Sequence, residues 1–310
     1  MDIPVVDFAA WSLRKRNISD EQIHTVKEQL ESAFTQVGFV FLKNTGITQE
    51  EVDRIMAVSK TFFLQPVEVK KPFRRDSFDV NPNHGWVRLE VERLNPCCPE
   101  DLKESFNVTS ISPDIKWPSG AAEDFQETQT SFFRRCGQLS LRVLRAMALS
   151  LSLDPQVFLS AHRLIGDEGN GTTLRSLYYP SVDHDKVKER QLRCGEHSDY
   201  GSITLLFSSS GGLQVRRRSG EFIDVPYVPG AVLVNVADLM QRWTADRFVS
   251  VVHRVRLPPV GDSSTRQSVV FFVHPDDDAL ITCCDGSNKY PPVTGGAYLE
   301  ERFKASYGAK

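Results

Sequence analysis

The sequence predicts an α+β protein, in which a helix-containing N-terminal part precedes an antiparallel β-sandwich or barrel. Two observations support this fold class. In the first half, apolar residues recur every three or four positions in long stretches, the spacing of helices that bury one face. From Thr173 onward, short β-rich runs separated by turn residues follow one another, which favours an antiparallel sandwich or barrel over a parallel α/β sheet.

The N-terminal part predicts strands and helices in alternation. Ile3–Phe8 predicts a strand, and Ser19–Gln22 has the form of a capping box that opens a helix. Gly38 predicts the end of that helix, and Phe39–Leu42 predicts a buried strand. Thr48–Glu51 predicts a second capping box at the start of another helix. Both helices are expected to turn an apolar side toward the protein core. In the first helix this side consists of Ile23, Val26, Leu30, Ala33, Phe34 and Val37, and in the second it consists of Val52, Ile55, Met56, Phe62 and Phe63.

The middle of the chain is less regular until one long helix begins. Residues 64–120 are rich in Pro, Asn and Asp, which predicts loops with short strands. Residues 126–153 predict a long helix with Phe132, Cys136, Leu139, Val143 and Met147 on its apolar side. The later strands are expected at Leu174–Tyr179, Ser202–Phe207, Gly212–Val215, Ala231–Val236, Val249–Val255 and Gln267–Val273.

Composition excludes several classes of protein. The chain has 310 residues and a net charge of −3 with both signs mixed, so it lacks the clustered basic face of a nucleic-acid-binding protein. Arg216–Arg218 is best explained as a solvated hairpin turn. No apolar stretch is long enough to cross a membrane, and no secretory signal is visible. The six cysteines form no C-x-x-C motif, which indicates free thiols in a reducing cytosol. We expect a cytoplasmic monomer acting on a small molecule, with no nucleic-acid or membrane partner.

A candidate metal site follows from His197-Ser198-Asp199 and the later His253. Residues two apart on a strand point to the same side, so an imidazole and a carboxylate face one point. Two histidines and one carboxylate leave coordination positions free, as non-haem iron(II) oxygenases require. The H-x-D pattern alone is weak, because His274-Pro275-Asp276 repeats it without a later histidine. A polar strand end and a zinc hydrolase site are the alternatives.

A second constellation lies on one predicted strand. Arg266 and Ser268 share a face, so a guanidinium and a hydroxyl could hold one carboxylate. The alternative is an exposed arginine in a surface ion pair. Phe272 and His274 continue the same face, and we expect them to line a substrate pocket. A plain core phenylalanine, a solvated histidine or a β-bulge that turns both away are the alternatives.

Taken together, these segments resemble the isopenicillin N synthase-like family of iron(II)/2-oxoglutarate-dependent dioxygenases. Family-like segments occur in order through most of the chain: Ile3–Phe8, Gly38–Ile47, Lys103–Phe106, Leu177–Pro180, Gly195–Gly201, Gly212–Val215, Asn235–Asp238, Val252–Val255 and Arg266–Ser268. Three positions depart from the common pattern: Leu177 replaces the Asn of plant members, Ser198 replaces Thr, and Ala237 stands where Gly is frequent. None of them removes a candidate ligand.

The resemblance implies a fold, a ligand set and a reaction. The fold would be a double-stranded β-helix, or jelly roll, with an N-terminal α/β extension. The four parts would be residues 1–120, the linking helix 121–165, the core 166–280 and the C-terminal segment 281–310. His197, Asp199 and His253 would ligate Fe(II), and Arg266, Ser268 and Tyr179 would hold 2-oxoglutarate.

The implied reaction consumes O2 and 2-oxoglutarate, releases succinate, and hydroxylates a small organic molecule, with desaturation or ring closure as variants. Ascorbate is expected to help in vitro. Two alternatives stay open at this point. One is an iron-dependent oxidase that does not use 2-oxoglutarate, since isopenicillin N synthase itself has the Arg/Ser pair. The other is a jelly-roll binding protein that has lost catalysis.

Overall fold

Two β-sheets form the core of the molecule. The computed structural model describes residues 2–15, 20–75, 83–111, 116–118 and 124–307. The large sheet has the order β1 (Val5–Asp7), β2 (Phe39–Lys43), β10 (Ala231–Val236), β7 (Ile203–Ser208), β12 (Arg266–Val273), β5 (Thr173–Tyr179), β4 (Glu104–Val108) and β3 (Gly85–Val87). The small sheet has the order β6 (Cys194–His197), β11 (His253–Val255), β8 (Leu213–Arg216) and β9 (Phe222–Asp224). β13 (Leu280–Ile281) and β14 (Val293–Thr294) pair separately.

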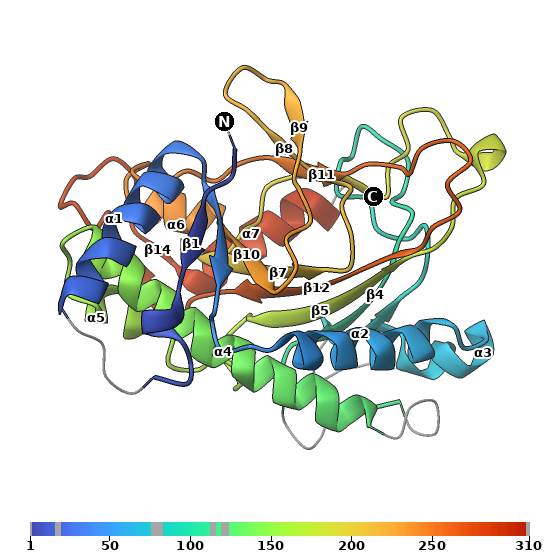
Figure 1. The fold of residues 1–310 in the computed structure, drawn as a ribbon, viewed down its shortest axis with the longest axis horizontal. Helices are drawn as coiled ribbons and strands as arrows, with labels where there is room; N and C mark the ends of the chain where they lie inside the picture. Colours follow the sequence, from blue (N-terminus) through green and yellow to red (C-terminus); the bar gives the residue numbers. More distant parts are fainter. Residues whose placement is uncertain (1, 16–19, 76–82, 112–115, 119–123, 308–310) are drawn as a thin grey trace.

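The two sheets pack face to face, as the predicted jelly roll requires. One buried apolar cluster joins Leu177 and Val270 of the large sheet to Leu213, Val215 and Val255 of the small sheet. All pairs within the two sheets are antiparallel except β1 with β2. In Figure 1 the β8–β9 hairpin lies on the side of the large sheet opposite to α2 and α4. The α+β fold class and the jelly-roll core are therefore confirmed.

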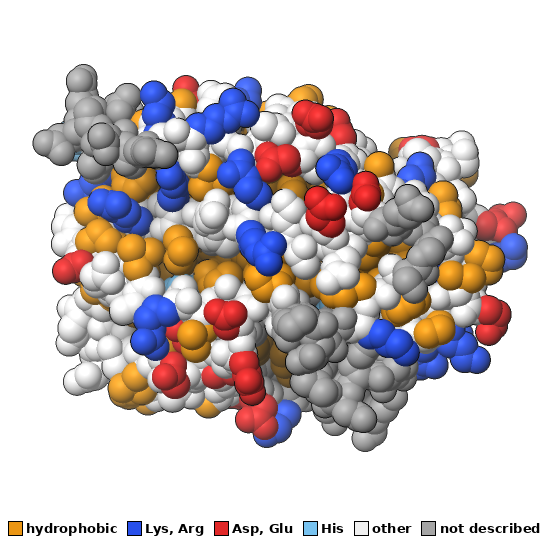
Figure 2. All heavy atoms as spheres, turned by 90° about the horizontal axis from the view of Figure 1, so that it is seen from below, with side chains coloured by type: hydrophobic (Ala, Val, Ile, Leu, Met, Phe, Trp, Pro, Cys, Tyr) orange, Lys and Arg blue, Asp and Glu red, His pale blue; other side chains and the backbone are white. Residues whose placement is uncertain are grey.

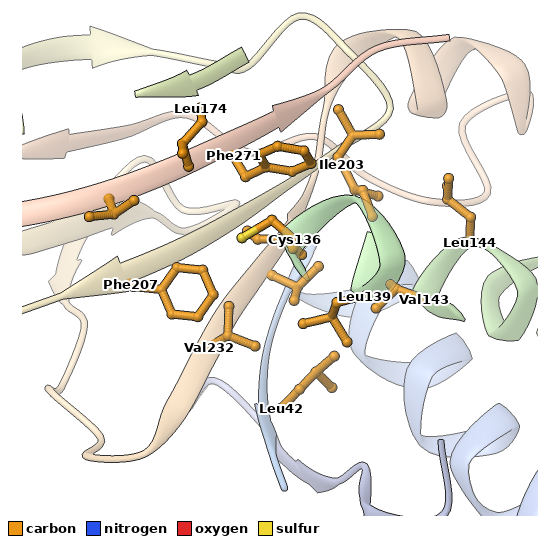
Figure 3. Packing of buried hydrophobic residues seen from close by; sticks show 14 of the residues in the cluster. Leu42, Cys136, Leu139, Val143, Leu144, Leu174, Ile203, Phe207, Val232 and Phe271 are labelled. Carbon is orange, nitrogen blue, oxygen red and sulfur yellow. The ribbon is translucent and has the colours of Figure 1, made fainter. Parts of the chain in front are cut away.

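Helices α1 (Asp20–Gln36), α2 (Gln49–Phe63) and α4 (Phe125–Ser150) cover the other face of the large sheet. The remaining helices are α3 (Val67–Lys70), α5 (Gln156–Leu159), α6 (Asp238–Trp243) and α7 (Gly295–Tyr307). The predicted apolar side of α4 is buried throughout, and Figure 3 shows Cys136, Leu139 and Val143 against strand residues such as Phe207 and Val232. Each such side chain contributes about 1.5–3 kcal/mol when it leaves water. These contacts pack α4 against the large sheet.

Strand β12 separates the helix side from the inner side of the sandwich. Val269, Phe271 and Val273 belong to the cluster that packs against the helices, whereas Val270 and Phe272 belong to the cluster between the sheets. The strand pairs with β5 and β7 without a register break from its first to its last residue. The alternation predicted from Arg266 onward therefore holds, and a β-bulge does not occur.

The helix boundaries follow the capping signals. Thr48 accepts a hydrogen bond from Glu51 N at 3.2 Å, and the Glu51 side chain accepts one from Thr48 N at 2.7 Å, so the second capping box is confirmed. The first one includes Ser19 and lies outside the described residues, although α1 begins at Asp20 as expected. Gly38 has a φ of +76°, and a Cβ there would lie 2.4 Å from Val249 O, so the chain requires glycine at this turn.

One predicted strand is mostly wrong. Only His253–Val255 of the expected strand 249–255 is extended in a sheet. Val249 N donates to Phe34 O, and Ser250 N donates to the Gln241 side chain, so this segment hydrogen-bonds to the α1 and α6 regions. A β-rich sequence does not reveal that its backbone partners will be helices.

Several surface features bear on the sequence-based expectations. Arg217 N donates to Glu221 O, so Arg217 and Arg218 lie in the hairpin turn between β8 and β9, whereas Arg216 ends β8. Acidic and basic side chains are interspersed on the face seen in Figure 2, with hydrophobic side chains exposed between them. All six cysteines are unpaired. Among the described residues, no helix has the length and apolar character needed to cross a membrane.

Candidate active site

The pairing of β6 with β11 brings the predicted metal ligands together. His197 ends β6 and lies directly opposite His253, the first residue of β11. Asp199 follows two residues after His197. Its Oδ1 lies 3.8 Å from His197 Nε2 and 3.7 Å from His253 Nε2. The three ligand atoms lie within 4.8 Å of one another, and no other such group occurs in the part of the chain that the structure describes.

Hydrogen bonds orient each of these side chains toward the shared point. His197 Nδ1 donates to Gly195 O at 2.8 Å, and His253 Nδ1 donates to Val251 O at 3.1 Å. Both Nε2 atoms therefore present lone pairs. Asp199 Oδ2 accepts from Thr204 Oγ1 at 2.7 Å and from Asn235 Nδ2 at 2.8 Å, which leaves Oδ1 facing the histidines. The sequence did not single out Thr204 or Asn235 for this role.

The electrostatics of the cluster suit a divalent cation. Burial, reinforced by the charge on His253, lowers the pKa of His197 to about 3, so this imidazole is neutral at physiological pH. Burial alone would raise the pKa of Asp199, but the two histidines and its hydrogen bonds lower it below the ordinary value. Two imidazoles and one carboxylate on a single face fit a non-haem iron site with hydrogen-bonded ligands.

A buried cationic site is formed by Arg266 and Ser268 of β12 and Tyr179 of β5; we call it the cationic cradle. Arg266 is 2 % exposed and pairs in register with Tyr179, and its guanidinium carbon lies 4.9 Å from the Tyr179 ring centroid. Its Nε donates to Gly211 O at 2.9 Å, and Nη1 lies 3.4 Å from Ser268 Oγ. No ion pair joins Arg266 to an Asp or Glu among the described residues, so the alternative of an exposed ion pair is wrong. A buried guanidinium without a carboxylate partner fits an anionic ligand.

Arg193 adds a second cation beside this cradle. It is 4 % exposed, and its pKa is lowered by burial and by the charge of Arg266. Its Nη2 donates to Pro180 O and Ser264 O, which ties together the chain ends next to Tyr179 and Arg266. The sequence analysis missed Arg193, although its position four residues before His197 placed it near the metal motif.

A cavity of about 80 Å³ opens directly beside the metal ligands. Phe272 and His274 line it, as their strand face predicted. Burial lowers the pKa of His274 to about 4, so it is neutral at physiological pH. The sequence did not identify the other principal side chains of the wall, which are Asn83, Arg175, Tyr200 and Phe303. They come from a loop, β5, the metal motif and α7, and only the fold brings them together.

Comparison with known proteins places these features in a family. The model of the 2OG-Fe(II) oxygenase superfamily matches residues 170–275, and a model described as non-haem dioxygenase in morphine synthesis N-terminal matches residues 3–128. A 2-oxoglutarate-dependent dioxygenase of Aspergillus rugulosus, htyE, is 31% identical over 91% of this chain and 90% of its own length. The chain belongs to the 2OG-Fe(II) oxygenase superfamily.

Solved structures of members of this superfamily agree with that assignment. A full-length Neurospora crassa protein in complex with alpha-KG and thymine has a TM-score of 0.85 and is 31% identical, covering 98% of this chain and 97% of that chain. JOX2 in complex with 2OG, Fe and JA has a TM-score of 0.76 and is 25% identical, covering 98% of this chain and 84% of that chain. This superfamily member is thus an iron(II)- and 2-oxoglutarate-dependent dioxygenase that acts on a small molecule, and O2 is its oxidant. Nothing favours a 2-oxoglutarate-independent oxidase or an inactive binding protein. The domain limits at residues 120, 165 and 280 stay predictions.

Proposed function

We propose that His197, Asp199 and His253 ligate Fe(II), and that Arg266, Ser268 and Tyr179 hold the distal carboxylate of 2-oxoglutarate. The convergence of two free Nε2 atoms on Asp199 Oδ1 carries the metal assignment. The buried, unpaired guanidinium of Arg266 supports the co-substrate assignment. Bound iron and 2-oxoglutarate supply the oxidation, in which O2 converts 2-oxoglutarate to succinate and CO2 and adds one oxygen atom to a substrate C–H bond.

The substrate that the cavity suits best is a small planar heterocycle with carbonyl groups, of the pyrimidine-base kind. The observation that carries this proposal is the combination of Tyr200 and Phe272 rings with the polar groups of Arg175 and Asn83 in one small wall. Aromatic rings stack on the faces of a base, and a guanidinium donates to its carbonyl oxygens. The binding of thymine and of 5-formyluracil by the similar Neurospora crassa protein supports the same substrate class.

The polar groups of this wall are held in place before a substrate arrives. Arg175 Nε donates to Asn107 Oδ1 at 2.8 Å, and Nη1 lies 3.3 Å from Glu92 Oε2. The guanidinium also lies 5.8 Å from the Phe272 ring centroid. Asn83 is held by Asn107, whose Nδ2 donates to Asn83 O at 3.0 Å. Such a fixed arrangement lowers the cost of ordering side chains when a rigid ligand binds.

The test is a substrate panel of thymine, uracil and free L-proline, each with Fe(II), 2-oxoglutarate and ascorbate. We expect thymine to stimulate succinate release and to yield a product heavier by one oxygen atom, while L-proline leaves the substrate-free rate unchanged. L-Proline is the informative comparison because a relative of similar identity is named a proline hydroxylase. Normal substrate-free succinate release without stimulation by either pyrimidine would reject the substrate class and leave the reaction class intact.

We also propose that the enzyme is a cytosolic monomer without a nucleic-acid or membrane partner. The six unpaired cysteines and the mixed surface charge support this. Light scattering during gel filtration should give the mass of one 35.0 kDa chain. Twice that mass would refute the monomer.

A further inference from the structure

A buried lysine, Lys103, pairs with two buried carboxylates. Lys103 is 3 % exposed and immediately precedes β4. Its Nζ pairs with Asp101 and lies 3.6 Å from Glu92 Oε2, and both carboxylates are also buried. Removing three charges from water is expensive, and apolar side chains of similar volume often stabilise a core equally well. The arrangement therefore raises the question of what these charges hold in place.

Asp101 is connected to the metal ligand His197 by two hydrogen bonds through Gly195. Asp101 Oδ1 accepts a hydrogen bond from Gly195 N at 2.8 Å, and Gly195 O accepts the Nδ1 proton of His197 at 2.8 Å. Asp101 thus fixes the strand residue whose carbonyl orients the first metal ligand. Lys103 is the one cation paired with Asp101 in the described part of the chain.

Glu92 forms an ion pair with Arg175, which lines the substrate cavity. Glu92 Oε2 lies 3.3 Å from Arg175 Nη1, and Glu92 Oε1 lies 3.7 Å from Arg75 Nη1. Burial opposes ionisation of Glu92, but Arg175, Lys103 and Arg75 together lower its pKa to about 2. Glu92 is therefore ionised at physiological pH, and it holds the arginine that lines the cavity.

We propose that Lys103 is a positioning residue that keeps Asp101 in place beneath Gly195 and Glu92 in place beside Arg175, so that one buried ammonium group orients both the metal ligand His197 and the cavity arginine. Loss of Lys103 should affect Asp101 and Glu92 to different extents. Without Lys103, Glu92 still has two arginine partners, whereas Asp101 is left without a cation. Removal of Lys103 should therefore weaken Fe(II) binding more than it weakens substrate binding.

The decisive comparison uses two double variants without the buried ion pair. Lys103→Met with Asp101→Asn keeps an oxygen that accepts from Gly195 N, whereas Lys103→Met with Asp101→Leu removes it at similar volume. Loss of a group that orients a metal ligand typically weakens metal affinity ~10–100-fold. We expect that loss in the Leu variant, with the Asn variant within a few-fold of the parent. The measurements are anaerobic Fe(II) affinity and the visible charge-transfer band formed with 2-oxoglutarate.

Single variants separate the two routes and control for burial. Lys103→Met alone should weaken Fe(II) binding, because Asp101 loses the ammonium group that holds it beneath Gly195. Glu92→Gln should raise the KM of the substrate and the ratio of succinate to product while Fe(II) affinity is kept. Lys70→Met is the matched control, because Lys70 is equally buried but pairs with Glu104. It should leave Fe(II) affinity unchanged.

The outcomes that overturn the proposal are specific. Equal Fe(II) affinity in the two double variants would show that the Asp101 oxygen does not position His197. An equal loss in Lys70→Met would show a general effect of core charges. The metal part of the inference rests on the proposed ligand roles but not on the substrate. Failure of the pyrimidine proposal would therefore appear in the substrate panel and leave the Fe(II) measurements unaffected.

Discussion

Removal of the Arg266 guanidinium should abolish tight binding of 2-oxoglutarate. Arg266 has five N–H donors. One donates to Gly211 O and one faces Ser268 Oγ, which leaves three for a carboxylate. Truncating one partner of a buried charge pair costs roughly 2–5 kcal/mol. At about 1.4 kcal/mol per tenfold change, Arg266→Ala should raise the KM for 2-oxoglutarate by about 30-fold to several thousand-fold.

The assay is succinate release against 2-oxoglutarate concentration, with anaerobic Fe(II) binding measured in parallel. Arg266→Lys should give an intermediate KM, because it keeps the charge but loses the planar fork and the bond to Gly211 O. Ser268→Ala should cost only about 0.5–1.5 kcal/mol, as a single hydrogen bond does. Arg256→Ala is the control, since that arginine is on the surface and pairs with Asp224. An unchanged KM in Arg266→Ala, with normal Fe(II) binding, would refute the assigned role.

Three further predictions test the metal site, the cavity and the acid stability. His197→Ala should abolish succinate release and lower the iron content, whereas His24→Ala, at an exposed histidine, should change neither; a fully active His197→Ala enzyme would remove the metal assignment. Once a substrate is known, Phe272→Ala and His274→Ala should raise its KM or alter the product, with substrate-free decarboxylation nearly normal; unchanged kinetics and product would place them outside the substrate contact. Burial lowers the pKa of His162 to about 4 from 6.5, so the unfolded state binds the proton more readily between these values. Stability should therefore fall as pH drops below 6.5, by up to about 1.4 kcal/mol per pH unit for this group; chemical denaturation should show a smaller pH slope in His162→Gln.

Local pattern was enough to place most elements. The helix that begins after Thr48 and the one that contains Cys136 and Leu139 carry both a capping or length signal and a complete apolar stripe, and both occur as expected. The expected strand 249–255 carried only a β-rich composition, and its first two residues hydrogen-bond to the α1 and α6 regions instead. The spacing of apolar residues and the capping signals are local properties of the sequence. The partner with which a strand pairs depends on segments far away in the chain.

Some residues of the candidate site could likewise be predicted from local spacing, and others could not. The spacing of His197-Ser198-Asp199 and the strand face shared by Arg266, Ser268 and Phe272 could be predicted from the sequence, because side chains two apart in a strand point to one side. The position of His253 opposite His197 became visible only in the folded chain, as did the gathering of Lys103, Arg175 and Arg193 around the same site. These groups meet through strand pairing and charge burial between segments far apart in the chain, and such contacts leave no periodic signal in the sequence.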